Sequence, residues 1–137
     1  MKKIILLLAV TMLLFTGCSP QPEETLKEYM IEFSIISDDL TLGSAGGGKE
    51  GAIKELKIQH ATVIDLRARL EKSGFDDLLE VVRLYEDGLL YTMLSLGPNS
   101  KPEYTDIMID SMEKSMDKWI EIGGDRYNSG YGNDILK

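Results

Sequence analysis

The chain has 137 residues, of which 43% are hydrophobic and 28% are charged, a composition typical of one folded domain and not of a disordered segment. It holds 15 Lys and Arg against 23 Asp and Glu, a formal net charge of −8. This charge argues against nucleic acid as a partner, because the phosphate backbone repels an acidic surface.

The N-terminal segment has the organisation of an export signal. Lys2 and Lys3 precede an apolar run over residues 4–15. A run of about 12 residues is too short to cross a hydrocarbon core of roughly 30 Å as a helix, but it suits the apolar region of a signal peptide. Residues 1–17 therefore predict a cleaved targeting segment that takes no part in the fold.

The end of this segment carries a resemblance to a known family. Leu14-Phe15-Thr16-Gly17-Cys18 resembles the lipobox of bacterial lipoproteins, although Phe15 stands where that family usually has leucine. The resemblance implies that Cys18 receives diacylglyceryl and palmitate-type acyl chains and becomes the first residue of the mature protein. We therefore expect a lipid anchor on the outer, extracytoplasmic face of the cell membrane, or in an outer membrane where the host has one.

The rest of the sequence agrees with such an anchor. Cys18 is the only cysteine, so no disulfide within the chain is expected. Removal of residues 1–17 leaves 13 Lys and Arg against 23 Asp and Glu, a formal charge of −10. At that charge the domain should stand off an anionic bilayer, on a short tether over residues 18–22 that contains Pro20 and Pro22.

Apolar residues recur at helical spacing in four segments of the mature chain, and no segment shows the sustained alternation of a strand. The predicted helices cover residues 23–40, 49–72, 75–96 and 101–122. The apolar arc expected to face the core includes Ile64 in the second helix, and Val82 and Leu90, but not Val81, in the third. Short polar connections between four helices favour an all-α fold, a small antiparallel bundle of three or four helices. We assign the helical domain to residues 23–123 and expect residues 124–137 to form a flexible glycine-rich tail.

Cap and stop residues set the expected ends of the last two helices. Ser73 and Ser100 are the candidate N-caps, and Pro102 suits a first helical turn. Gly97-Pro98 and Gly123-Gly124 supply the stop signals.

Three polar side chains fall within the apolar arcs of the predicted helices. His60, the only histidine, and Arg67 share a face of the second helix, and Glu86 lies in the arc of the third. Because an unpaired buried charge is costly, we hypothesise that Glu86 pairs with Arg67 or His60 across the helix interface. Such a polar cluster would fix the helix register, sense pH through His60 or line a ligand pocket. In the alternative, Arg67 and Glu86 lie at the edge of the arc and reach solvent with their tips.

The fourth predicted helix carries two surface patterns. An acidic stripe recurs at spacings of three and four residues opposite the apolar face, as a solvated surface or as a dock for a basic partner. It consists of Asp106, Asp110, Glu113 and Asp117. The methionines Met108, Met112 and Met116 suit core packing or an adaptable binding surface, and Met116 is the one expected to face outward.

Catalysis and cofactor binding find little support in the sequence. Zinc sites draw three or four ligands mainly from Cys and His, and one histidine with one lipidated cysteine cannot supply them. No nucleophile elbow accompanies a serine. The glycine-rich segment 43–49 lacks the Ser or Thr that must follow the lysine of a phosphate-binding loop. We expect no enzyme activity, no metal and no cofactor.

These patterns favour a membrane-anchored lipoprotein of the cell envelope that binds another envelope or secreted protein through a helical face. A lipid anchor raises the effective concentration of such a module beside its partner. The alternative is a small-ligand carrier or sensor with an interhelical pocket around His60, Arg67 and Glu86.

Overall fold

A computed structural model describes residues 22–42 and 48–128 of the chain. Within these ranges the elements are α2 (Pro22–Leu42), α3 (Gly48–Leu70), α4 (Asp76–Leu96), α5 (Pro102–Glu121) and the 3-10 helix η2 (Gly124–Tyr127). None of these helices combines the length and the apolar character needed to span a membrane. The predicted signal segment, Cys18, residues 19–21 of the tether and residues 129–137 of the tail lie outside the described residues.

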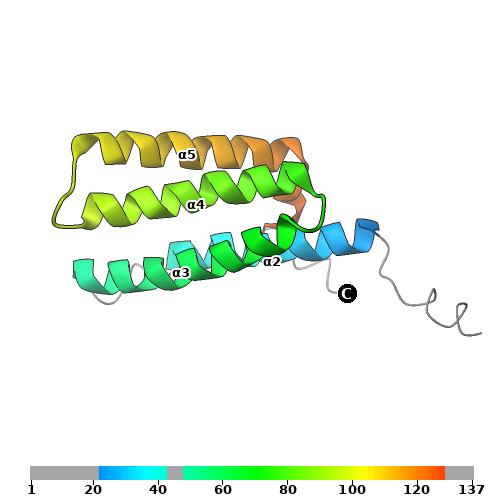
Figure 1. Ribbon diagram of the computed structural model, residues 1–137, viewed down its shortest axis with the longest axis horizontal. Helices are drawn as coiled ribbons and strands as arrows, with labels where there is room; N and C mark the ends of the chain where they lie inside the picture. The colour runs from blue at the N-terminus through cyan, green and yellow to red at the C-terminus, as the bar shows by residue number, and fades with distance from the viewer. Residues whose placement is uncertain (1–21, 43–47, 129–137) are drawn as a thin grey trace, which may run out of the picture.

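The described helices pack as an antiparallel bundle, which confirms the predicted all-α class. α4 lies between α3 and α5, and both neighbours run antiparallel to it (Figure 1). α2 packs along α3 at one end of the bundle, and α3 extends beyond α2 at the other end. We name the end with the first turn of α2, the α3–α4 turn and η2 the proximal end, and the opposite end the distal end.

Glycine and proline set the helix ends as predicted, whereas neither predicted serine is an N-cap. Phe75, not Ser73, occupies the N-cap position of α4, without a side-chain cap hydrogen bond. α4 ends just before Gly97, and Gly123 takes a left-handed φ of 74° after α5. Ser100 is not an N-cap, because Lys101 occupies that position without a side-chain hydrogen bond and Pro102 begins the helix. Proline is tolerated there because the first-turn N–H groups of a helix have no intrahelical acceptor.

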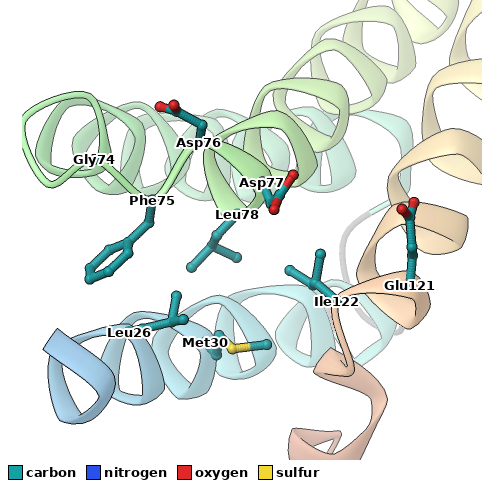
Figure 2. Close-up of a pocket in the computed structure, with 9 residues that line it drawn as sticks. All are labelled: Leu26, Met30, Gly74, Phe75, Asp76, Asp77, Leu78, Glu121 and Ile122. Atoms are coloured by element: carbon teal, nitrogen blue, oxygen red, sulfur yellow. The ribbon is translucent and has the colours of Figure 1, made fainter.

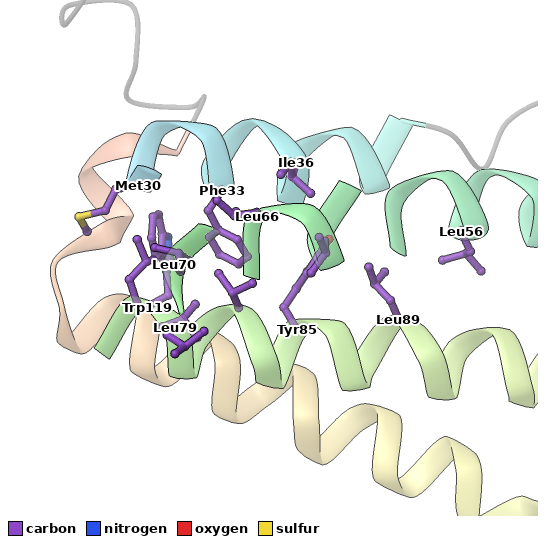
Figure 3. Close-up of a cluster of buried hydrophobic side chains, with 14 residues drawn as sticks. Met30, Phe33, Ile36, Leu56, Leu66, Leu70, Leu79, Tyr85, Leu89 and Trp119 are labelled. Atoms are coloured by element: carbon purple, nitrogen blue, oxygen red, sulfur yellow. The ribbon is translucent and has the colours of Figure 1, made fainter. Parts of the chain in front are cut away.

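The core is one cluster of apolar side chains gathered around α4 (Figure 3). Val81 and Val82 are both fully buried, although only Val82 falls in the predicted apolar arc. The arc is wider than predicted because α4 packs against α5 as well as α3, so two of its faces are covered. Leu90 and Ile64, by contrast, were expected in the core and are 38% and 37% exposed.

Small residues bring α4 and α5 close together. Gly88 is buried, and a β-carbon built there would lie 2.7–2.8 Å from three side-chain atoms of Met112. Ser115 is buried on α5, and its hydroxyl donates to the carbonyl oxygen of Val81 at 3.0 Å. This close packing fixes which face of α5 points inward, and therefore which face is left to solvent.

The prediction that a flexible tail begins at residue 124 is wrong for its first residues. Gly124–Tyr127 forms η2, and the Ser34 hydroxyl of α2 donates to the Tyr127 carbonyl oxygen. The indole Nε1 of Trp119 donates to Oδ1 of Asn128 at 3.0 Å. A β-carbon at Gly124 would lie 2.1–2.3 Å from the Trp119 ring, so glycine permits this contact. Residues 124–128 are folded because α2, distant in sequence, supplies contacts that local composition does not reveal.

Candidate functional site

Arg67 and Glu86 meet across the interface between α3 and α4. The Nε of Arg67 donates to Oε2 of Glu86 at 2.6 Å. A second donor, Arg67 Nη1, lies 2.8 Å from Oε1 of Glu71, and Arg83 Nη2 donates to the same oxygen at 3.1 Å. These four side chains form a line of alternating charge, which we name the seam network: Arg67, Glu71, Arg83 and Glu86.

The seam network lies at the edge of the core. The side chains of Arg67 and Glu86 are 29% and 18% exposed, so they pair across the interface and also reach solvent. Hydrogen bonds from Arg83 and Arg67 lower the pKa of Glu71. The pKa of Arg67 is raised by hydrogen bonds to Glu71 and Glu86. Each of the four charges therefore has a partner of opposite sign, and the Arg67–Glu86 pair links α3 to α4.

His60 lies apart from the seam network. It is half-buried on α3, and among the described residues no hydrogen bond or ion pair joins it to Arg67 or Glu86. Seven residues along a helix separate it from Arg67 by two turns, about 10 Å. The hollow beside the network has a volume of about 240 Å³ and is lined by Arg67, Arg83, Glu86 and Asp87. The structure therefore does not bring the three predicted residues into one pocket.

A further ion pair, which the sequence did not suggest, joins α2 to α3. The guanidinium of Arg69 donates to both carboxylate oxygens of Glu32, and its Nε donates to Asp65 at 3.0 Å. It also lies over the Tyr29 ring, 5.7 Å from the centroid. The hydrogen bonds to Glu32 raise the pKa of Arg69. Arg69 lies outside the apolar arc of α3, so helical periodicity gave no signal for this contact.

The acidic stripe of α5 lies on the side of the helix opposite the core. Its four members, Asp106, Asp110, Glu113 and Asp117, are all exposed. Asp110 pairs with Lys114 at 2.7 Å, whereas no cation in the described part of the chain pairs with the other three. These three carboxylates therefore differ from the paired charges of the seam network.

The charge of α5 as a whole is negative. The helix carries six carboxylates against two lysines, a formal charge of −4. Lys118 is directed toward α4, where its Nζ lies 3.6 Å from Asp77 and 3.5 Å from Glu80. Within residues 22–42 and 48–128, no three His, Cys, Asp or Glu side chains are grouped as metal ligands. The stripe therefore presents an open anionic surface along the helix.

Exposed apolar side chains form a row beside the acidic stripe. At 100° per residue its members fall within about 40° of one another around the helix, on the flank away from α4. The apolar row consists of Ile109, Met116 and Ile120, which are 46%, 64% and 55% exposed. This confirms that Met116 faces outward, while Met108 and Met112 are half-buried. The exposure of Ile109 and Ile120 was not predicted, because an isoleucine next to a core-facing arc usually belongs to the core.

Other exposed apolar side chains are less exposed than the apolar row or lack an equally exposed apolar neighbour on their helix. Ile35 on α2 and Ile58 on α3 are 58% and 54% exposed, as much as the apolar row, but within the described residues neither has a second apolar side chain of that exposure on its helix. Leu90 and Leu94, one turn apart on α4, are less exposed, at 38% and 39%. Scattered apolar residues are normal on a protein surface, whereas contiguous ones mark interaction sites. We therefore take the apolar row together with the acidic stripe as the candidate functional site, and name the two the α5 face.

A pocket of about 750 Å³ opens at the proximal end (Figure 2). Side chains from the N-terminal half of α2, from the start of α4 and from the residue after α5 give it an apolar floor, with carboxylates at the rim. The floor contains Leu26, Met30, Phe75, Leu78 and Ile122, and the rim Asp76, Asp77 and Glu121. The volume lies within the range of small-molecule sites. This pocket was not predicted, since three separate helices build it.

Comparison of the chain with protein-family models, with curated proteins and with solved structures finds no match. The function therefore has to be inferred from the geometry of the molecule.

Proposed function

We propose that this chain is a lipid-anchored lipoprotein of the cell envelope, without enzyme activity, that binds a protein partner through the α5 face. The observation that carries the proposal is the apolar row, whose three side chains are about half exposed and lie in line along the helix. Covering such side chains removes apolar area from water, which is the main source of binding free energy in protein association.

The position of the first helix supports a role beside a membrane. α2 begins at Pro22, four residues after the lipobox cysteine, Cys18. Four residues span at most about 14 Å, so lipid on Cys18 would hold the proximal end of the bundle close to the bilayer. The α5 face runs along the side of the bundle between its two ends, where a partner in the same envelope can reach it.

Membrane fractionation tests the anchor. The wild-type chain should float with membranes as a processed species, and Cys18→Ala should be recovered in the soluble fraction or as unprocessed precursor. A cytosolic wild-type chain that retains Met1 would contradict the anchor.

Photocrosslinking in intact cells tests the binding face. A photoreactive residue at position 116 should capture a protein partner, because Met116 is the most exposed member of the apolar row. The matched control is the same residue at position 58, where Ile58 is also more than half exposed but has no equally exposed apolar neighbour among the described residues of its helix. Equal capture at both positions, or none at 116, would contradict binding through the α5 face.

The proximal pocket favours a second candidate function, carriage of a small ligand. Its apolar floor and acidic rim suit an apolar molecule that carries an ammonium group. Alkylammonium compounds should then raise the melting temperature of the protein, and Leu26→Trp, which fills the pocket from its floor, should abolish that shift. A shift that persists in Leu26→Trp would rule out this pocket as the ligand site.

A further inference from the structure

We infer that the α5 face accepts a cationic amphipathic helix, with an apolar stripe bordered on one side by Lys or Arg. This inference rests on the proposed function, since it names the chemistry of the partner that the α5 face binds.

The shape of the apolar row favours a helix as its occupant. From Ile109 to Ile120 the row covers 12 residues, whose 11 steps along the helix amount to about 16 Å. Three turns of a partner helix have the same length and present an apolar stripe of the same width. Two helices packed side by side approach to about 8–10 Å between axes, which brings flanking side chains of the partner next to the acidic stripe.

The negative charge of the α5 face favours a positively charged partner. Asp106, Glu113 and Asp117 have no cation partner in the described residues, and they lie next to the apolar row around the helix. Lys114 is engaged by Asp110, and Lys118 by carboxylates on the opposite flank. Lysine or arginine along one edge of the partner would pair with these three carboxylates and accelerate association.

The same charges disfavour the other occupants of an apolar face. A second copy of the chain would bring a helix of charge −4 against an identical helix, and like charges oppose such pairing. An anionic bilayer surface is repelled for the same reason. The chain's own segment 129–137 contains one Asp and one Lys, so it offers no cationic edge to the stripe.

Peptide titration tests the inference with the full chain. The protein is held in nanodiscs of phosphatidylcholine, a lipid without net charge, and titrated into a dye-labelled Leu/Lys amphipathic peptide of about 14 residues, roughly 21 Å as a helix. The control peptide has Glu in place of Lys. Fluorescence anisotropy should show saturable binding of the Lys peptide only.

Two sets of variants locate the binding. Met116→Ser combined with Ile120→Ser should weaken binding of the Lys peptide about tenfold or more, because most of the apolar row is lost. Ile35→Ser combined with Ile58→Ser, matched in exposure, should leave it unchanged. Neutralising Asp106, Glu113 and Asp117 as Asn, Gln and Asn should weaken it several-fold at low salt, and high salt should remove that difference.

Several results would overturn the inference. Equal binding of the Glu peptide, or an equal loss in the matched control pair, would show that the contact is not specific to the α5 face. Binding that appears only after removal of residues 129–137 would make that segment the native occupant. Crosslinking from position 116 in cells together with no binding of the Lys peptide would leave the proposed function standing and refute the cationic helix alone.

Discussion

The seam network and the α5 face are both rich in charge, but they satisfy their charges differently. In the seam network each carboxylate lies 2.6–3.1 Å from a guanidinium nitrogen. On the α5 face three carboxylates have no cation partner in the described residues, and exposed apolar side chains adjoin them. The number of charged residues alone therefore does not tell the two regions apart. The pairing of the charges and the burial of their apolar neighbours separate a contact that stabilises the fold from a surface available for binding.

The largest effect on stability is expected from Arg67→Leu. Glu86, whose side chain is only 18% exposed, would lose the one cation partner that it has among the described residues. Because the pair is partly buried, the loss in unfolding free energy should be about 1–2 kcal/mol, between the values for exposed and buried pairs. Urea denaturation measures it. Arg83→Leu, at a side chain that is 56% exposed, should cost less than about 1 kcal/mol, and an equal loss in both variants would contradict the role assigned to Glu86.

Acid should weaken the seam network through Glu71. Hydrogen bonds from Arg83 and Arg67 lower its pKa from the ordinary 4.5, so ionised Glu71 stabilises the fold above that value. This contribution is lost as the pH falls through the lowered pKa. Glu71→Gln should therefore flatten the decline of unfolding free energy between about pH 5 and pH 3. Glu113→Gln serves as the control, because Glu113 has no cation partner in the described residues. A similar flattening in that variant would refute the distinction between the seam network and the α5 face.

The smallest effect is expected on the α5 face. Replacement of Asp106, Glu113 and Asp117 by Asn, Gln and Asn should change the unfolding free energy by only a few tenths of a kcal/mol, in the stabilising direction, because like charges three and four residues apart repel. Urea denaturation and crosslinking from position 116 are measured on the same variant. The account requires lower crosslinking at unchanged stability, and a loss above about 1 kcal/mol would show that the stripe is structural.

The sequence predicted those features that depend on one helix at a time. Helical spacing, the glycines after α4 and α5, and the proline at the start of α5 placed the described helices within two residues of their observed ends. The acidic stripe is exposed as expected, since it lies opposite the apolar arc of the same helix.

Features that depend on how helices meet were harder to predict. Arg67 and His60 share an arc of α3, yet only Arg67 lies level with Glu86, and that choice depends on the register between α3 and α4. Val81 is buried because α4 is covered on two sides, which no single arc reveals. The apolar row was missed for a related reason. A single arc does not show which flank of a helix its neighbours cover, and the flank of α5 that carries the row lies away from α4.

Thiol accessibility tests the central claim that a partner covers the α5 face in the envelope. The chain's only cysteine is Cys18, so an introduced cysteine is the one free thiol once lipid occupies residue 18. Met116→Cys and Ile58→Cys are labelled with a maleimide in native membranes and again after purification. The account predicts that labelling at 116 is several-fold slower in membranes than after purification, while position 58 reacts equally in both. Equal rates at 116 in the two preparations would contradict it.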